Sequence, residues 1–313
     1  MYPDWFLGAG FFCFGLIFGS FLNVCIYRLP RGLSVISPRS ACPECHAPIA
    51  AFDNIPVLSW LILGGRCRHC HTRITPRYAA VELICGLLFL LSFLQNGTSN
   101  GAAKGCVLSF LLVGLTFTDA ETHLLPDAMT LPGIGMAFIF SGFVLVPGPA
   151  YKLFPVHLQG NTTLLQLNLQ LALRSLANSL MGAILGAGIL YLIAWIYLKL
   201  RKVDGMGLGD VKLMAMAGAF FGPVLTLFVL CTASLLGGAY GICVLLAVFR
   251  KRFVRYRKRP GGQPASRAWR AAQIAMQGLE LPFGVFLCLM SIIGWFYGTQ
   301  MIRAYLRTLG IPA

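Results

Sequence analysis

The feature that most constrains this sequence is a series of long apolar stretches, separated by short segments that carry most of the charge. Of the 313 residues, 57% are hydrophobic and 11% are charged, whereas a soluble domain usually has about 25% charged residues. A helix that spans a bilayer needs about 20 mostly apolar residues. This composition excludes an ordinary soluble domain, a disordered chain and a disulfide-stapled secreted module. The sequence predicts an all-α polytopic membrane protein.

About eight apolar segments are candidates for transmembrane helices. They are residues 5–27, 78–95, 102–119, 130–147, 175–200, 211–221, 224–249 and 282–303. Gly222 and Pro223 divide the longest apolar run, because proline lacks a backbone donor and ends helices. The division leaves an unusually short helix that begins at Val211. Short spans are tolerated where protein or a water-filled cavity surrounds them, so we expect the chemistry of the molecule near this helix.

The positive charges predict the orientation in the membrane. Lys and Arg number 25 against 10 acidic residues, for a net charge of +15. If the N-terminus lies outside, the cytoplasmic segments are 28–77, 119–129, 199–212 and 249–281, and they hold 20 of the 25 basic residues. Such a bias is typical of cytoplasmic loops. Because the charges lie in loops between spans, we expect contact of the basic loop 249–281 with anionic lipid and no binding of nucleic acid.

The longest external segment in this topology is the loop 148–174. The spacing of Leu164, Leu167 and Leu171 indicates a short amphipathic helix that lies on the membrane surface. No residue type in this loop indicates catalysis. No internal repeat is apparent in the chain.

Four of the eleven cysteines have the spacing of metal ligands: Cys42, Cys45, Cys67 and Cys70. Two such Cys-x-x-Cys pairs are typical of a tetrahedral Zn²⁺ site, and the reducing cytoplasm disfavours two disulfides. Four protein ligands leave no open coordination position, so the Zn²⁺ is expected to be structural, in a small cytoplasmic domain. A redox pair and an iron–sulfur centre are the alternatives, and His46, His69 and His71 are spare ligand candidates.

Acidic residues are sparse, and they concentrate at two helix ends. Asp119 ends a predicted span, where the helix dipole disfavours an anion, whereas Asp127 and Asp210 could cap the helices that follow them. Gly207 and Gly209 would let the backbone approach closely and would place Asp210 at the edge of a cavity. Two carboxylates at the membrane boundary suggest an aspartic-protease arrangement, because close like charges hold one proton between them.

Several motifs carry a family resemblance. Gly207-Leu-Gly209-Asp210 matches the GxGD signature of intramembrane-type aspartic peptidases. The further motifs, in chain order, are Gly19-Ser-Phe-Leu-Asn23, Arg28-Leu-Pro30, the paired Cys-x-x-Cys, Asn54-Ile-Pro56, Leu124-Leu-Pro-Asp127 and Pro282-Phe-Gly284. With this ordered set, the chain resembles the bacterial type IV prepilin leader peptidases from the first span nearly to its C-terminal end.

The resemblance implies an eight-span enzyme of the bacterial inner membrane with two activities. It would remove the leader peptide from type IV prepilins or type II secretion pseudopilins at the cytoplasmic face. It would then N-methylate the new N-terminal residue with S-adenosylmethionine. By motif position, Asp119 and Asp210 would be the catalytic pair, and Asp127 would match a later Asp of the family pattern. The cysteine domain would belong to the bifunctional branch of the family.

The chain departs from the family pattern at Glu121, where Asp is common, and at Val285, where the family's Pro-Phe-Gly-Pro ends in proline. Two alternatives from other classes are an ion- or proton-coupled transporter that uses the same acids and a non-enzymatic pilus or secretion assembly protein. No residue identifies a methyl-donor pocket or an oligomeric state. The expected division is a first transmembrane helix (1–27), the zinc-binding domain with the four cysteines (28–77) and the GxGD peptidase membrane core (78–313).

Overall fold

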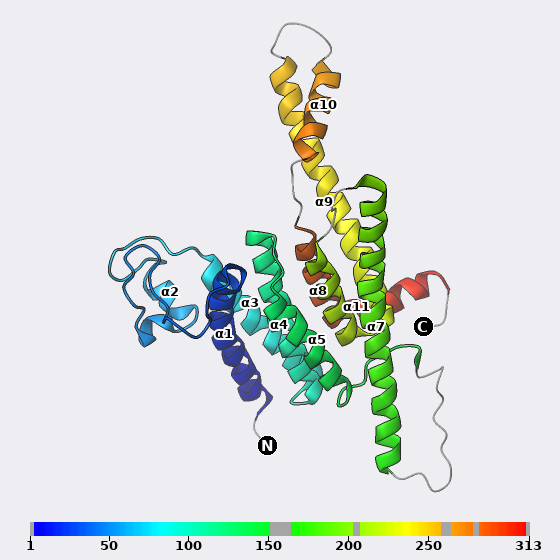
Figure 1. Cartoon of the computed structure of the whole chain (residues 1–313). Helices are drawn as coiled ribbons and strands as arrows, with labels where there is room; N and C mark the ends of the chain where they lie inside the picture. The colour runs from blue at the N-terminus through cyan, green and yellow to red at the C-terminus, as the bar shows by residue number, and fades with distance from the viewer. Residues whose placement is uncertain (1–2, 151–163, 203–206, 258–263, 278–281, 311–313) are drawn as a thin grey trace.

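The computed structural model describes residues 3–150, 164–202, 207–257, 264–277 and 282–310, and these are almost entirely helical (Figure 1). In chain order the α-helices are α1 (Asp4–Arg28), α2 (Leu58–Ile62), α3 (Arg77–Asn96), α4 (Asn100–Thr122), α5 (Asp127–Ser141), α7 (Leu164–Arg201), α8 (Leu208–Phe221), α9 (Pro223–Arg257), α10 (Pro264–Gln277) and α11 (Phe283–Thr308). Two 3₁₀ turns, η1 (Leu29–Arg31) and η2 (Ala51–Asn54), precede α2. The described residues contain no strand, only two isolated bridges. The predicted all-α fold is confirmed.

Every predicted apolar segment lies wholly or largely within a helix. Among the described residues, six helices are long and apolar enough to cross a membrane: α1, α3, α4, α7, α9 and α11. The other two, α5 and α8, have 15 and 14 residues and rise only about 21–23 Å, which is less than the roughly 30 Å of a bilayer core. The short helix predicted at Val211 is α8, which begins three residues earlier, at Leu208.

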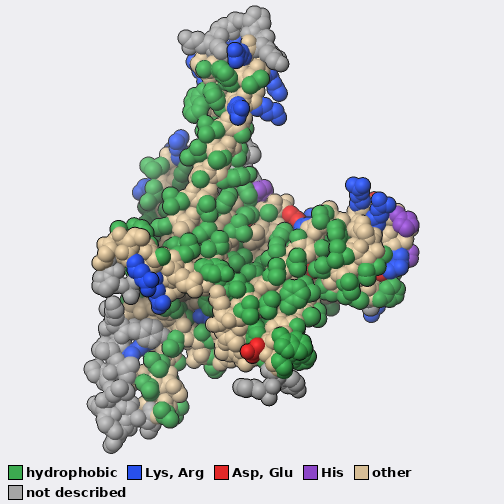
Figure 2. Space-filling model, turned by 180° about the vertical axis from the view of Figure 1, so that it is seen from behind, with side chains coloured by type: hydrophobic (Ala, Val, Ile, Leu, Met, Phe, Trp, Pro, Cys, Tyr) green, Lys and Arg blue, Asp and Glu red, His purple; other side chains and the backbone are tan. Residues whose placement is uncertain are grey.

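The outer surface of the bundle is apolar. Large hydrophobic side chains are exposed along the long helices, for example Ile17 on α1, Ile184 on α7 and Leu235 on α9. Figure 2 shows hydrophobic side chains covering the middle of the molecule, while Lys and Arg gather on the parts that project from it. A soluble monomer rarely exposes so large an apolar surface, so this surface is suited to contact with lipid.

Glycines bring α7 and α8 into direct backbone contact. A Cβ added to Gly182 of α7 would overlap the carbonyl oxygen of Gly218 of α8. One added to Gly186 would lie 2.5 Å from the carbonyl oxygen of Met214. Small residues four apart permit this close packing in membrane helices. Since α5, α9 and α11 also contact α8, the short helix is held at the centre of the bundle and its N-terminal end has a fixed position.

The C-terminal part of the predicted external segment 148–174 is described, and it is helical. The described part of 148–174 shows no separate amphipathic helix, because α7 begins at Leu164 and continues unbroken to Arg201. No glycine or proline interrupts it between Leu164 and Ser175, and residues 151–163 lie outside the described chain. Helix α5, in contrast, is shorter than the predicted apolar segment: it ends at Ser141, not at residue 147.

The basic segment 249–281 forms much of a helical hairpin. Helix α9 continues to Arg257, and α10 packs back against it. The contact buries Ala268 and Ala272 and places the ring of Trp269 5.8 Å from that of Phe249. Figure 1 shows this hairpin projecting from the end of the bundle. The described basic residues of this segment therefore lie on a helical projection rather than in an extended loop.

Candidate active site and metal centre

Asp119 lies in the last turn of α4 and is buried, with 5% of its surface exposed. Its carboxylate accepts a hydrogen bond from the backbone N–H of Val285, with 2.8 Å between that nitrogen and Oδ2. Val285 belongs to the first turn of α11, whose unsatisfied N–H groups and dipole favour an anion. The unfavourable position at the end of α4 is thus compensated by the start of another helix.

Gly284 brings Asp119 and Asp210 together. Asp210 lies in the first turn of α8. A Cβ added to Gly284 would lie 2.8 Å from Oδ2 of Asp119 and 3.1 Å from Oδ1 of Asp210. Both oxygens therefore face the same point beside the α11 backbone, and they cannot be further apart than the sum of these two distances. The structure joins the two predicted carboxylates in one site, although they are far apart in sequence.

Asp127 does not belong to this pair. Its two carboxylate oxygens lie 2.7 and 2.8 Å from Nζ of Lys212, which follows Asp210 on α8. The predicted capping role is also absent, since Pro126 is the N-cap of α5 and no side chain caps this end. Asp127 instead links α5 to α8 through an exposed ion pair.

The carboxylate pair lies at the same end of the bundle as the cysteine domain. Arg77, at the start of α3, forms an ion pair with Glu121, which follows Asp119 by two residues at the end of α4. Since the cysteine motifs directly precede α3, this contact fixes the C-terminal end of α4 beside them. The site therefore lies at the end of the helix bundle that carries the cysteines.

Sequence reasoning missed the role of α11 in this site. The Pro282-Phe-Gly284 motif contributes to the family resemblance, but its residue types do not predict contact with Asp119 and Asp210. The close backbone approach expected beside Asp210 is found at Gly209, where an added Cβ would lie 3.0 Å from Cβ of Leu125. Gly284 in the first turn of α11, just after the N-cap Pro282, could have indicated this contact. A glycine there leaves room for a side chain from another helix to reach the helix N-terminus.

The four predicted cysteines form one cluster. Their Sγ atoms all lie within 4.8 Å of one another, with 3.7 Å between Cys42 and Cys70 and 3.9 Å between Cys45 and Cys67. A tetrahedral site with Zn–S bonds of 2.3 Å requires about 3.8 Å between sulfurs, so the geometry fits a metal ion. Backbone N–H groups of Cys70 and His69 also hold the pKa of the Cys67 thiol down to about 6, which favours the thiolate. Among the described residues, no histidine belongs to the cluster.

The two Cys-x-x-Cys motifs have the same local structure. In each motif a short bridge flanks the cysteines, Ala41 with Pro48 and Arg66 with Arg73. The residue after the second cysteine, His46 or His71, has a φ of 56° in both. Its N–H bonds back to the carbonyl of the first cysteine at 3.0 Å in both. The two motifs share the pattern Cys-x-x-Cys-His and differ at most other positions.

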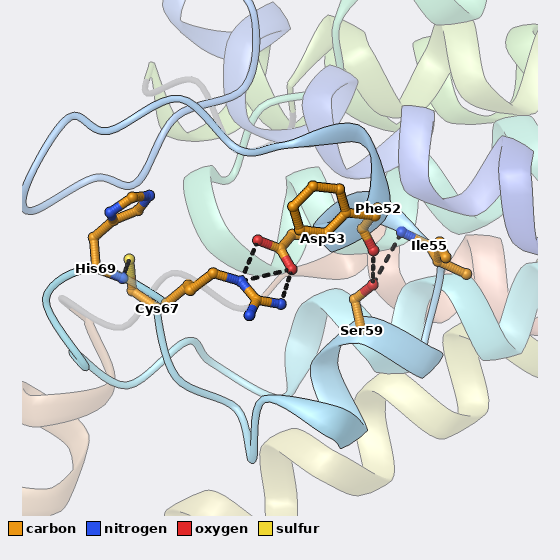
Figure 3. A network of polar contacts seen from close by, with 7 residues as sticks. Phe52, Asp53, Ile55, Ser59, Cys67 and His69 are labelled. Atoms are coloured by element: carbon orange, nitrogen blue, oxygen red, sulfur yellow. Dashed lines mark hydrogen bonds and ion pairs between the residues drawn. The ribbon is translucent and has the colours of Figure 1, made fainter.

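A polar network holds the second cysteine motif to the middle of its domain (Figure 3). The guanidinium of Arg68 binds Asp53 of η2, with 2.8 Å between Nε and Oδ2, and this cation keeps the pKa of the Asp53 carboxyl below its usual value. Beside it, the Ser59 hydroxyl of α2 donates to the carbonyl of Phe52 and accepts from the N–H of Ile55. These contacts give the domain an internal framework despite its few buried apolar residues.

Comparisons with known proteins agree with this architecture. Residues 13–96 match the Bacterial Peptidase A24 N-terminal domain, and residues 106–242 match the Type IV leader peptidase family. The first match includes the cysteine motifs, and the second includes both Asp119 and Asp210. No solved structure matches the chain.

Curated relatives cover most of the chain. A prepilin leader peptidase/N-methyltransferase of Aeromonas salmonicida is 31% identical over 95% of this chain and 93% of its own length. Proteins of the same name from Neisseria gonorrhoeae and Myxococcus xanthus are 35% and 36% identical, over 74% and 84% of this chain and 80% and 71% of their own lengths. The chain therefore belongs to the type IV leader peptidase family.

Proposed function

We propose that this chain is a bifunctional membrane enzyme. It removes the leader peptide from type IV prepilins or type II secretion pseudopilins, and it N-methylates the residue that becomes N-terminal. The observation that carries the proposal is the convergence of Asp119 and Asp210 on Gly284. The names of the curated relatives support both activities.

In this proposal the two carboxylates share one proton. Like charges this close do not both ionise readily, so one member is a carboxylate and the other a carboxylic acid. The carboxylate takes a proton from the attacking water, and the acid polarises the carbonyl of the scissile peptide bond. The Val285 N–H stabilises negative charge on Asp119, which makes Asp119 the better candidate for the ionised member.

The proposed location is the bacterial inner membrane, with the N-terminus outside and the cysteine domain in the cytoplasm. The distribution of Lys and Arg supports this orientation, and the Arg77–Glu121 pair puts the carboxylate site at the cysteine-bearing face. The pilin segment, an apolar helix, would enter between spans with its basic leader near the headgroups. The three-part division into 1–27, 28–77 and 78–313 belongs to the same proposal.

Two small molecules complete the proposal. The cluster of four cysteines holds a structural Zn²⁺, since its thiol ligands match the softness and tetrahedral geometry that this ion accepts. S-adenosylmethionine is the methyl donor, as the relatives' name implies. Zinc with four cysteine ligands has no open position and takes no part in the hydrolysis.

A transporter and an assembly protein are the rival functions. Transporters place their ionisable groups near the bilayer midplane, whereas Asp119 lies in the last turn of α4. The test is to incubate the purified protein with a prepilin and a labelled methyl donor, and to measure the masses of the mature pilin and of the released leader peptide by mass spectrometry. We expect a truncated and singly methylated pilin. An intact prepilin, together with ion flux in proteoliposomes, would instead establish a transporter.

A further inference from the structure

A buried carboxylate without a cation lies where the cysteine domain meets the bundle. Glu82 of α3 is 8% exposed. Its Oε2 accepts a hydrogen bond of 2.7 Å from the backbone N–H of Val57, and the Ser20 hydroxyl also interacts with the carboxylate. Both of these groups are neutral. Within the described residues no Lys or Arg forms an ion pair with Glu82. A carboxylate in such a place is costly and usually serves a function.

A second acceptor lies one turn away and has no partner. Asn23 of α1 is 4% exposed, and its amide Nδ2 donates to the carbonyl of Tyr78 at 3.0 Å. Its Oδ1 is buried and has no hydrogen-bond partner. Ser20 and Asn23 share one face of α1, and Tyr78 and Glu82 share one face of α3, because residues three or four apart are neighbours on a helix. The seam between the helices thus holds one buried carboxylate with neutral partners and one buried amide oxygen that has no donor.

The backbone around Glu82 is unusually constrained. Val57 has a φ of 60° and a ψ of −48°, and the N–H of Leu58 bonds to the carbonyl of Pro56 at 2.6 Å, which defines a γ-turn. This region is unfavourable for a β-branched residue, and strain of this kind concentrates at functional sites. On the other side, a Cβ on Gly19 would lie 2.6 Å from Cα of Glu82. The position of the carboxylate is therefore set from both helices and from the cysteine domain.

Glu82 lies at a depth in the bundle similar to that of the proposed peptidase site. The Arg77–Glu121 ion pair aligns α3 with α4. Glu82 follows Arg77 by five residues and Asp119 precedes Glu121 by two, so the two acids differ in depth by only about 5 Å, one helical turn. Helix α4 also contacts both α1 and α3.

We propose that Glu82 and Oδ1 of Asn23 bind the new α-amino group of the cleaved substrate during its N-methylation, an inference that rests on the proposed function. An ammonium group offers three N–H donors and a positive charge, which matches one carboxylate and one unpaired amide oxygen. Before cleavage the same nitrogen is a neutral peptide nitrogen. The site therefore selects the product of the first reaction.

Glu82 also accounts for the proton that methylation must remove. The carboxylate takes one proton from the ammonium, and the nitrogen lone pair then forms a bond to the methyl carbon of S-adenosylmethionine. The bond between that carbon and sulfur breaks, and its electron pair stays on sulfur, giving S-adenosylhomocysteine. Glu82 passes its proton to water. The general-base role makes Glu82 a catalytic residue of the methyl transfer and not of the cleavage.

The test uses Glu82→Gln in the purified full-length protein in lipid nanodiscs. Glutamine keeps an oxygen for the Val57 N–H but cannot take a proton. We expect prepilin cleavage within about threefold of wild type and methylation of a synthetic pre-cleaved peptide to fall about 100-fold or more. We also expect the wild-type protein to bind the free-amine peptide about tenfold more tightly than its N-acetylated form, and the variant to lose that preference.

The matched control is Asp4→Asn, which removes an exposed carboxylate at the other end of α1 and should change none of these values. Wild-type methylation of the pre-cleaved peptide by Glu82→Gln, or a retained preference for the free amine, would overturn the inference. So would a parallel loss of cleavage, methylation and thermal stability, which indicates a structural role. If the wild-type protein itself methylates nothing, the proposed function fails in that part, and the binding comparison still decides the assignment of Glu82.

Discussion

The backbone N–H of Val285 donates a hydrogen bond to the carboxylate of Asp119, from a position 166 residues further along the chain. The contact joins the end of α4 to the start of α11. A carboxylate at a helix C-terminus is unfavourable by itself, and the N-terminus of a second helix offsets this. The candidate site therefore depends on three helices, α4, α8 and α11, although the sequence motif indicates only two of them.

Gly284→Ala should disable the carboxylate site without unfolding the protein. The new methyl group would lie 2.8 Å from Oδ2 of Asp119 and 3.1 Å from Oδ1 of Asp210, so the carboxylates must separate. Small misplacements at a reacting centre cost about 100-fold in rate. We therefore expect the rate of prepilin cleavage to fall about 100-fold, measured by the change in pilin mobility on a denaturing protein gel. Val285→Ala keeps the backbone N–H and is the control. Equal activity of Gly284→Ala and Val285→Ala would argue against a shared site beside α11.

The contact between α7 and α8 should be sensitive to a single methyl group. Gly218→Ala puts a Cβ against the backbone of Gly182, where no flexible side chain can give way. Overpacking of this kind costs about 1–3 kcal/mol, so the midpoint of thermal unfolding in detergent should fall. Gly188→Ala adds the same methyl group on α7 where nothing lies within 4 Å, and it should be neutral or slightly stabilising. A fall in stability for Gly188→Ala but not for Gly218→Ala would contradict this packing.

The cysteine cluster should bind one metal ion per chain. Cys42→Ser and Cys67→Ser each remove one of four thiols that lie within 4.8 Å of one another, so the metal content measured by mass spectrometry should fall to background. Cys13→Ser, on the exposed surface of α1, should keep the wild-type content. Strong chelators should loosen the cysteine domain and expose it to proteases, because metal binding and folding are coupled in such small domains. Unchanged metal content in both cluster variants would refute the site.

Much of the fold could be predicted because a helix that crosses a membrane needs a long apolar segment. Apolar length located every helix that crosses the bundle, and Gly222-Pro223 located the division between α8 and α9. Helix ends were predicted less well. Nothing in the residues from Leu164 to Ser175 marks a stop, and α9 passes into the basic segment as one helix to Arg257, since Arg and Lys favour helix as much as the apolar residues before them.

The candidate site was partly predictable for a different reason. The chemistry of the residues singled out Asp119, Asp210 and the four cysteines, because carboxylates and paired thiols are rare in an apolar chain. Contacts made through backbone atoms cannot be recognised from residue types in the sequence. The Val285 N–H, the absent Cβ of Gly284 and the turn at Val57 acquire their roles only when distant segments meet.

The most direct test of the account is prepilin cleavage by three matched variants in the same membrane preparation. Asp119→Asn and Asp210→Asn each remove one member of the carboxylate pair and should abolish cleavage, with the protein still inserted and its metal content unchanged. Asp127→Asn removes an acid of the same kind that binds Lys212 in an exposed ion pair, and it should cleave within about threefold of wild type, because such pairs contribute little. Cleavage at the wild-type rate by Asp119→Asn or by Asp210→Asn would contradict the account.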